Sequence, residues 1–98
     1  GSLQLHLSSN VLTKNGIEID LTPKEYLMIQ MFMENPGKAL SRDELLNGVW
    51  GKDFFGDPKT VDVHVRRIRE KIEDDSSEPQ FIQTVWGYGY RFRKDTER

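Results

Sequence analysis

The strongest constraint on the fold lies in residues 60–72, TVDVHVRRIREKI. Written as an α-helix, this stretch carries its branched apolar side chains at i, i+4, i+7 and i+11, the spacing of one buried stripe: Val61, Val65, Ile68 and Ile72. At about 100° per residue, Val63 points to the opposite side, among charged residues. The pattern predicts an amphipathic helix with a well-formed buried face, and it leaves a lone valine on the charged face to be explained.

Three short strand-like segments precede this helix, at residues 3–7, 11–13 and 17–21. The first and the last alternate apolar and polar residues, as strands with one buried face do. Asn15-Gly16 is a strong hairpin-turn dipeptide, because both positions tolerate positive φ. An antiparallel sheet is therefore expected at the N-terminus.

Two further helices are marked by their start signals. TPKE at residues 22–25 combines a capping threonine, a proline suited to the first helical position and a glutamate that completes a capping box. That helix stops before residues 35–37. SRDE at residues 41–44 has the same capping-box pattern and predicts a second helix, which runs to Gly51.

The helix described first has Asp57 as its cap and Pro58 at its first position, and it extends to about Asp74. After it, residues 81–86 and 90–93 form a hairpin with a tight glycine-containing tip. The order is strands, three helices and a hairpin. It predicts an α+β fold, a winged helix-turn-helix, with residues 3–98 as a single domain; residues 1–2 are expected to be a cloning scar on a domain cut from a longer protein.

Composition excludes several classes of protein. The chain has no cysteine, so disulfides and thiolate metal sites are excluded. No apolar run approaches the roughly 20 residues of a membrane span, and a cytoplasmic protein is expected. The net charge is −2 but segregated: residues 59–69 carry four bases and one acid, a local charge of +3, whereas residues 73–78 carry four acids and no base.

No arrangement of residues supports an enzyme. His6 and His64 have no partner at metal-ligand spacing, and Thr22 and Ser41 are interpreted as helix caps without an activating base. The acidic run at residues 73–78 is expected to be solvated. No catalytic residue, metal or cofactor is predicted.

Two interpretations of the charged helix face stay open. In a major groove, Val63 would meet a thymine methyl and Arg67 a guanine, while Asp62 would accept from a cytosine amine or hold an arginine in place. Alternatively, the face is merely solvated and carries i,i+4 ion pairs: Asp62–Arg66, Arg66–Glu70 and Arg69–Glu73. The helix alone does not separate the two, and the basic hairpin that follows favours DNA.

Four segments, in their order and spacing, resemble the effector domain of OmpR/PhoB-type response regulators: LTPKEYLMIQMF, LSRDELLNGVWG, KTVDVHVRRIREKIE and TVWGYGYRF. The resemblance covers nearly all of the chain from Leu3 to Phe92. It implies a sequence-specific DNA-binding output domain that regulates transcription. Helix 58–74 would lie in the major groove of direct-repeat promoter sites, and hairpin 81–93 on the flanking backbone or minor groove.

The same resemblance implies partners beyond DNA. A receiver domain, absent from this chain, would be phosphorylated by a cognate histidine kinase and would control dimerisation. RNA polymerase would be contacted by the loop of residues 50–57, with Lys52, Asp53, Phe54, Phe55 and Gly56. Because the chain lacks heptads and apolar runs outside its predicted core, we expect a monomer in isolation and a tandem dimer on DNA.

By matching position, the resemblance implies a set of DNA contacts. The residues mostly on phosphates are Lys59, Thr60, His64, Arg66, Arg69 and Tyr90. The residues near base edges are Asp62, Val63 and Arg67. Trp50 and Thr84 would also meet the DNA.

The chain departs from the family pattern at two places. Trp86 stands where many members have an arginine that enters the minor groove. Trp86 stays in the predicted contact set but cannot supply that cation, and Arg91 or Arg93 is expected to contribute affinity for the DNA backbone instead. The family's N-terminal sheet often has four strands and only three are predicted here, so the chain is expected to begin inside or after the first. The rival hypothesis is a winged-helix protein-interaction module, which would suit the acidic net charge and would lack a steep salt dependence of DNA binding.

Overall fold

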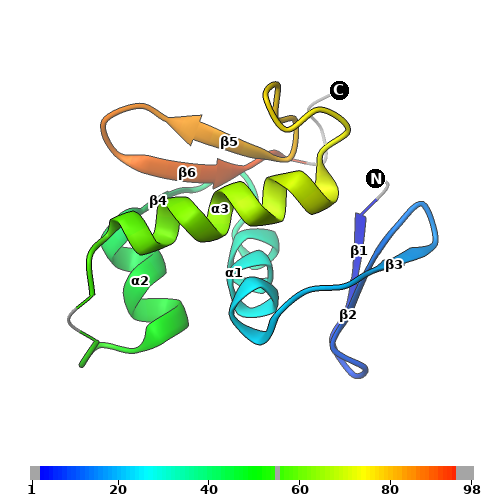
Figure 1. The fold of residues 1–98 in the computed structure, drawn as a ribbon, viewed down its shortest axis with the longest axis horizontal. Helices are drawn as coiled ribbons and strands as arrows, with labels where there is room; N and C mark the ends of the chain where they lie inside the picture. The colour runs from blue at the N-terminus through cyan, green and yellow to red at the C-terminus, as the bar shows by residue number, and fades with distance from the viewer. Residues whose placement is uncertain (1–2, 55, 95–98) are drawn as a thin grey trace.

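The computed structural model describes residues 3–54 and 56–94 (Figure 1). Its elements, in chain order, are β1 (Leu3–His6), β2 (Val11–Lys14), β3 (Ile17–Ile19), α1 (Pro23–Glu34), β4 (Ala39–Ser41), α2 (Arg42–Trp50), α3 (Lys59–Ile72), β5 (Ile82–Val85) and β6 (Gly89–Phe92). The predicted α+β winged-helix arrangement is confirmed. Within the described part of the chain, no helix combines the length and the apolar character needed to cross a membrane.

The N-terminal sheet has the order β1-β2-β3, with antiparallel neighbours. Its register aligns Leu5 with Leu12 and Leu12 with Ile19, so apolar side chains from three strands share one face. Asn15 and Gly16 form the β2–β3 turn with φ of 54° and 81°, as their dipeptide predicts. The sheet stands at the opposite end of the molecule from α2, with α1 between them (Figure 1).

The second sheet contains a strand that the sequence did not predict. β4 pairs with β6, which gives the order β4-β6-β5. A strand of three residues that ends on the helix cap Ser41 has no periodicity to detect, and its pairing partner comes at the far end of the chain. A Cβ atom at Gly89 would lie 2.1 Å from the carbonyl oxygen of Leu40, so glycine is required for the two strands to approach this closely.

Both predicted capping boxes are present. At the start of α1, Thr22 Oγ1 accepts from Glu25 N at 3.3 Å, and Glu25 Oε1 accepts from Thr22 N at 2.9 Å. Ser41 and Glu44 make the same two hydrogen bonds at the start of α2, each 3.0 Å long. These bonds satisfy backbone N–H groups that a helix start leaves without partners.

The start of α3 differs by one residue from the prediction. The helix begins at Lys59, although Pro58 already has helical backbone angles. Asp57 Oδ1 accepts from Lys59 N at 2.9 Å, so the predicted capping contact is made just before the helix boundary.

The end of α3 corrects a prediction about the acidic run. The helix ends at Ile72 rather than near Asp74, because Glu73 adopts an extended backbone. The Glu73 carboxylate accepts from three successive backbone N–H groups, at 2.7–3.1 Å: Gln80, Phe81 and Ile82. Glu73 is only 8% exposed, so the expectation that the whole run is solvated is wrong at this position, where the carboxylate joins the end of α3 to the start of β5.

The buried stripe of α3 is confirmed, since Val61, Val65, Ile68 and Ile72 are all 0% exposed. They belong to one core with Met28, Ile29 and Phe32 of α1, Leu45 of α2 and Ile82 of β5. The β5–β6 hairpin lies along α3, with its tip towards the N-terminal half of that helix (Figure 1). α3 is therefore held on one side by the two other helices and the hairpin.

Glu25 is a charged group inside this core. It is 1% exposed, and its Oε1 atom lies 2.6 Å from Lys71 Nζ on α3. Burial acts to raise the pKa of Glu25, but the hydrogen bond from Lys71 and the bonds from Thr22 outweigh it and hold the pKa below its usual value. The ion pair ties the start of α1 to the end of α3.

We expect Glu25→Gln to lower the free energy of unfolding at pH 7 by roughly 1–3 kcal/mol, because Lys71 loses a charged acceptor. Since the pKa of Glu25 is lowered by folding, its contribution is complete above pH 4.5, the usual value, and is lost as the pH falls through the folded value. Urea unfolding followed by circular dichroism between pH 7 and pH 3 measures this. The difference between wild type and variant should shrink towards pH 3; a difference that stays constant would contradict the assignment.

Candidate nucleic-acid interface

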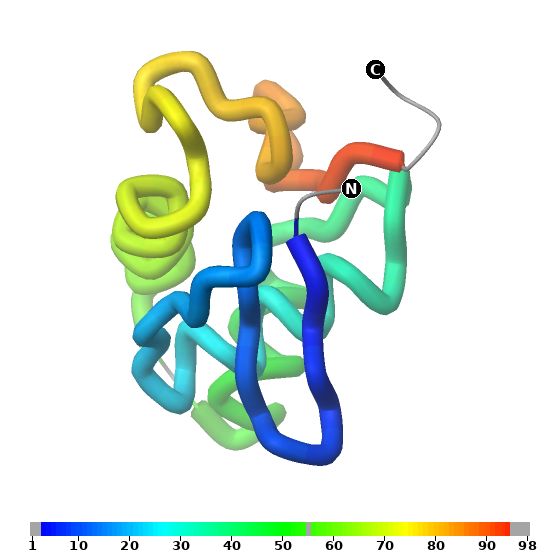
Figure 2. Tube along the Cα trace, turned by 90° about the vertical axis from the view of Figure 1, so that its right-hand side faces the viewer, coloured from blue at the N-terminus to red at the C-terminus, as the bar shows by residue number. Residues whose placement is uncertain are grey.

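The outward face of α3 is exposed and basic. Lys59, Arg66 and Arg67 are all exposed, and the Val63 side chain between them is 46% exposed. Figure 2, which looks along α3, shows the helix at one edge of the molecule with its outward side uncovered. The packing of the apolar stripe therefore presents the valine and its cationic neighbours together.

The expected i,i+4 ion pairs do not form among the described residues. Asp62 Oδ1 pairs instead with Arg42 Nε of α2 at 3.1 Å. Arg66 and Arg67 have no carboxylate within ion-pair distance in residues 3–54 and 56–94. The alternative of a solvated face neutralised by its own acids is not realised, and these two guanidinium groups remain available.

Asp62 is held from two elements. Besides Arg42, it accepts from Tyr90 Oη of β6 at 2.6 Å. Burial, and then the hydrogen bond to Asp62, raise the pKa of Tyr90 to about 12, so this hydroxyl stays a donor at any physiological pH. Of the two roles predicted for Asp62, the structure contains the one in which it holds an arginine.

Arg69 is half-buried and makes hydrogen bonds within the fold. Its Nε and Nη2 atoms donate to Ile82 O at 3.1 and 2.8 Å, and Nη2 also donates to Thr84 Oγ1 at 2.9 Å. The guanidinium lies 5.3 Å from the ring centroid of Tyr90, and burial lowers its pKa. Arg69, expected on a phosphate, connects α3 to the hairpin.

Trp50 and His64 meet at the N-terminal end of α3. Their rings make an edge contact with centroids 4.8 Å apart. His64 Nδ1 lies 2.9 Å from Thr60 O; since a carbonyl only accepts, this nitrogen is the donor. The Trp50 ring also stacks on Phe54 at 6.0 Å and lies under Lys24 Nζ at 5.8 Å. The predicted contacts Trp50, Thr60 and His64 thus form one cluster.

The hairpin divides its predicted contacts between two faces. Thr84 and Tyr90 face α3, as their bonds to Arg69 and Asp62 show. Arg91 lies between the buried residues Tyr90 and Phe92, so strand alternation turns it to the other face, where its Nε donates to Gln83 Oε1 at 2.7 Å. Trp86 stands at the tip and is 90% exposed. The structure does not bring Arg91 to the side of α3.

The predicted polymerase-contact loop connects α2 to α3. Lys52 and Asp53 are exposed, whereas Phe54 is 39% exposed because one face of its ring stacks on Trp50. A Cβ atom at Gly56 would lie 1.9 Å from the Phe54 ring, so the glycine makes room for it. Phe55 lies outside the described residues.

Arg42 is a residue of this surface that sequence reasoning did not find. One of the two roles predicted for Asp62 was to hold an arginine, but several arginines were available. Arg42 qualifies only because β4, which precedes it, docks against β6 and so brings the start of α2 beside α3. The role predicted for Asp62 indicated an arginine partner, but identifying Arg42 as that partner required β4, which the sequence did not predict.

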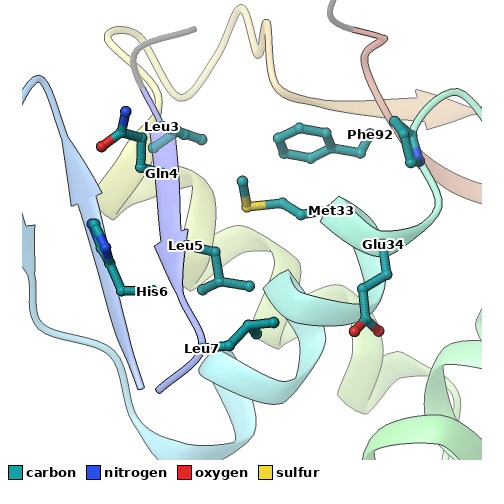
Figure 3. Close-up of a pocket in the computed structure, with 9 residues that line it drawn as sticks. Leu3, Gln4, Leu5, His6, Leu7, Met33, Glu34 and Phe92 are labelled. Atoms are coloured by element: carbon teal, nitrogen blue, oxygen red, sulfur yellow. The ribbon is translucent and has the colours of Figure 1, made fainter. Parts of the chain in front are cut away.

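A cleft of about 560 Å³ lies elsewhere, between β1 and the end of α1. Figure 3 shows Leu3, Leu5 and Leu7 pointing towards Met33 and Phe92 across it, while Gln4 and His6 point to the other side of β1. The cleft has no converging set of polar groups of the kind that a catalytic site needs. Within the described residues there is also no group of three or more His, Asp or Glu side chains that could hold a metal ion.

Comparisons with known proteins agree with this geometry. The family model described as "Transcriptional regulatory protein, C terminal" matches residues 16–92. A probable transcriptional regulatory protein of Picosynechococcus sp. is 53% identical over 81 residues, which cover 83% of this chain and 32% of that protein. This chain therefore spans about a third of the length of that relative.

Solved structures give the same result. The response regulator DrrB of Thermotoga maritima, described as an OmpR/PhoB homolog, matches with a TM-score of 0.89 and 35% identity over 96% of this chain and 42% of its own. The RstA DNA-binding domain of Klebsiella pneumoniae, solved in complex with the RstA box, matches with a TM-score of 0.86 and 30% identity over 95% of this chain and 92% of its own.

Arg66 and Arg69 should differ in their effect on stability. Arg69→Ala removes three hydrogen bonds between α3 and the hairpin, and we expect it to lower the free energy of unfolding by roughly 1–3 kcal/mol. Arg66→Ala alters an exposed side chain and should change it by less than about 0.5 kcal/mol. Arg69→Lys is the matched control: it keeps the charge but loses the fork geometry, so it should stay destabilised. Equal unfolding midpoints for Arg66→Ala and Arg69→Ala would refute the stabilising role of the hydrogen bonds that Arg69 makes between α3 and the hairpin.

Proposed function

This chain belongs to the family of C-terminal domains of transcriptional regulatory proteins, the output domains of OmpR/PhoB-type response regulators, and on that premise we propose that it binds double-stranded DNA in a sequence-specific manner. The observation that carries the proposal is the outward face of α3, where Val63 lies among exposed cations without ion-pair partners in the described residues. Duplex DNA needs that combination from a reading helix: cations for phosphates and an apolar group for a base edge.

In this proposal α3 enters the major groove. Val63 meets a thymine methyl, and Arg67 donates to the acceptor edge of a guanine. Lys59, Thr60 and Arg66 bind phosphates on either side of the groove. Asp62 serves as a positioning residue, since its carboxylate is already shared between Arg42 and Tyr90.

The cluster of Trp50, Thr60 and His64 at the start of α3 supports a further contact to the DNA backbone. Because His64 Nδ1 donates to Thr60 O, the opposite ring nitrogen, Nε2, is the one left for a phosphate, and it donates to a phosphate oxygen in the imidazolium form, which carries a proton on both nitrogens. The Trp50 ring packs against that imidazole and limits its rotation. Lys24 lies over the same indole and adds positive charge.

A protein-interaction module is the less favoured alternative. Its support was the acidic net charge, yet acids such as Glu25, Asp62 and Glu73 are engaged within the fold. Two relatives of the same fold, RstA of Klebsiella pneumoniae and AdeR, have DNA-binding domains solved in complex with DNA.

For the longer protein we propose the organisation of a two-component regulator. A phosphorylatable receiver domain, served by a histidine kinase, would join this domain and control its pairing on direct-repeat sites. The isolated domain would be a monomer, since it has no heptad repeat and no apolar run outside its core to dimerise through. A single module of this size buries only about 600–1,000 Å² of protein surface on DNA, so a linked second copy would strengthen binding. RNA polymerase would meet the α2–α3 loop.

Selection of bound duplexes from a random pool is the experiment that tests DNA binding. The domain should enrich one short sequence, and its affinity should fall with salt by about 0.9 log units per phosphate contacted for each log unit of salt. Failure to retain any duplex at low salt would refute the proposed function.

Arg67 and Arg66 should have separable effects on the enriched duplex. Arg67→Ala should weaken binding by about 1–3 kcal/mol and relax base preference at one position, since it removes a donor to a base edge. Arg66→Ala should weaken selected and random duplexes alike and reduce the salt slope by about one contact. Fluorescence anisotropy at several salt concentrations measures both. If Arg67→Ala binds selected and random DNA as wild type does, Arg67 reads no base.

The α2–α3 loop should affect transcription without affecting DNA binding. Lys52 and Asp53 are exposed, while Phe54 is partly used against Trp50. We expect Lys52→Ala or Asp53→Ala, placed in the full-length regulator, to reduce transcription from a promoter that carries the enriched site, with promoter affinity unchanged. Glu18→Ala, an exposed change in the N-terminal sheet, is the control. Parallel losses of binding and transcription would argue against a separate polymerase surface.

A further inference from the structure

Lys24, at the start of α1, is a half-buried cation without a carboxylate partner among the described residues. Its Nζ atom donates to the Val49 carbonyl oxygen at 3.2 Å. The ammonium groups of Lys14 and Lys71, by contrast, each lie 2.6 Å from a carboxylate oxygen. Because removing a charge from water costs free energy, an ammonium held in this way without a counter-ion is more consistent with an anion supplied by a partner than with a purely internal role.

The internal role of Lys24 is a contact to the end of α2. The last carbonyl groups of a helix lack intrahelical partners and carry partial negative charge, which a lysine can satisfy. An ammonium group has three N–H donors, and Val49 O is the one acceptor within hydrogen-bond distance in the described part of the chain. The bond therefore fixes the position of the ammonium and leaves two donors for a ligand.

Lys24 adjoins the cluster of Trp50, Thr60 and His64. Its Nζ atom lies 5.8 Å from the centroid of the Trp50 ring, and that ring contacts the His64 ring with centroids 4.8 Å apart. Figure 1 shows the start of α1 below α3, and Figure 2 shows both at the same edge of the molecule. The surface that we propose for DNA thus continues from α3 and α2 onto a third helix.

We propose that the Lys24 ammonium binds a phosphate of the DNA backbone, beside the phosphate that His64 meets. The inference rests on the proposed DNA binding and adds a contact from α1, an element that carries none of the contacts proposed above. Phosphate contacts position a protein on a duplex but carry no sequence information directly. Lys24 would therefore add affinity for any duplex and fix the orientation of α3 in the groove, without selecting a base.

The salt dependence of binding tests this contact. The probes are the duplex enriched by the domain from a random pool, trimmed to one half-site, and an unrelated duplex of the same length. Lys24→Met keeps an unbranched side chain over the indole but removes the charge, so it should weaken binding to both duplexes and reduce the salt slope by about 0.9. The affinity ratio of wild type to variant should then fall roughly threefold between about 50 and about 200 mM salt. Lys24→Arg keeps the charge and should keep the wild-type slope.

Methylphosphonate substitution identifies the phosphate. Each phosphate of the half-site duplex is replaced in turn by a methylphosphonate, which is uncharged. At the position that Lys24 meets, the substitution should weaken binding by wild type but have no further effect on Lys24→Met, because that variant has already lost the contact. A role confined to the end of α2 would not depend on any single phosphate.

Two controls address net charge and folding. Lys38→Met removes the same charge from an exposed side chain just before β4, across the molecule from α3, and should leave the salt slope unchanged (Figure 2). Lys24→Met also loses the bond to Val49 O and should unfold at a somewhat lower urea concentration than wild type. Binding is therefore measured without urea, at a temperature at which circular dichroism shows both proteins to be folded.

The outcomes distinguish this inference from the function on which it rests. If wild type binds the half-site and Lys24→Met has the wild-type salt slope, the phosphate contact is refuted while DNA binding stands. The contact is equally refuted if Lys24→Met loses affinity by the same factor at every salt concentration and responds to every methylphosphonate as wild type does, since Lys24 would then act only on α2. If wild type retains no duplex at all, the proposed function fails first.

Discussion

The burial of one stripe on α3 is the constraint on which the rest of the structure depends. Val61, Val65, Ile68 and Ile72 are completely buried, and each such side chain contributes roughly 1.5–3 kcal/mol when fully removed from water. A helix with one face fixed in the core has its opposite face fixed in solvent. The placement of Val63 between cations therefore follows from packing, and a rigid element carries the candidate interface.

The polar residues of α3 divide into two groups because of what lies beside them. Asp62 and Arg69 flank the buried stripe, where the hairpin and α2 supply partners: Tyr90, Arg42, Thr84 and the Ile82 carbonyl. Lys59, Arg66 and Arg67 point further out and meet no such partner among the described residues. The first group sets the distance and angle between the helix and the hairpin, and the second is left for a ligand.

The sequence predicted features that depend on neighbouring residues. Capping boxes, the Asn15-Gly16 turn and the α3 stripe involve residues within one or two turns of each other, so local chemistry determines them. It did not predict β4, the burial of Glu73 or the Arg42–Asp62 pair. Each of these depends on a partner brought close by the tertiary fold: β6 for β4, the start of β5 for Glu73 and the docked α2 for Asp62. Position on a helix face likewise did not reveal that the Arg69 guanidinium donates to the Ile82 carbonyl, since that acceptor comes from the hairpin.

The net charge of −2 is misleading for the same reason. Glu25 pairs with Lys71 and Asp62 with Arg42, and three backbone N–H groups bond the Glu73 carboxylate, so these carboxylates are engaged elsewhere and do not pair with the outward cations of α3. The outward cations of α3 have no such neutralisation within the described residues, and they lie within a helical turn or two of one another. At physiological salt, charges act over about 8 Å, so an approaching anion experiences this local cluster rather than the total. The pairing state of each charge, which only the tertiary structure reveals, thus leaves cations on the outward face of α3 that are unpaired in the described part of the chain, although the chain as a whole is acidic.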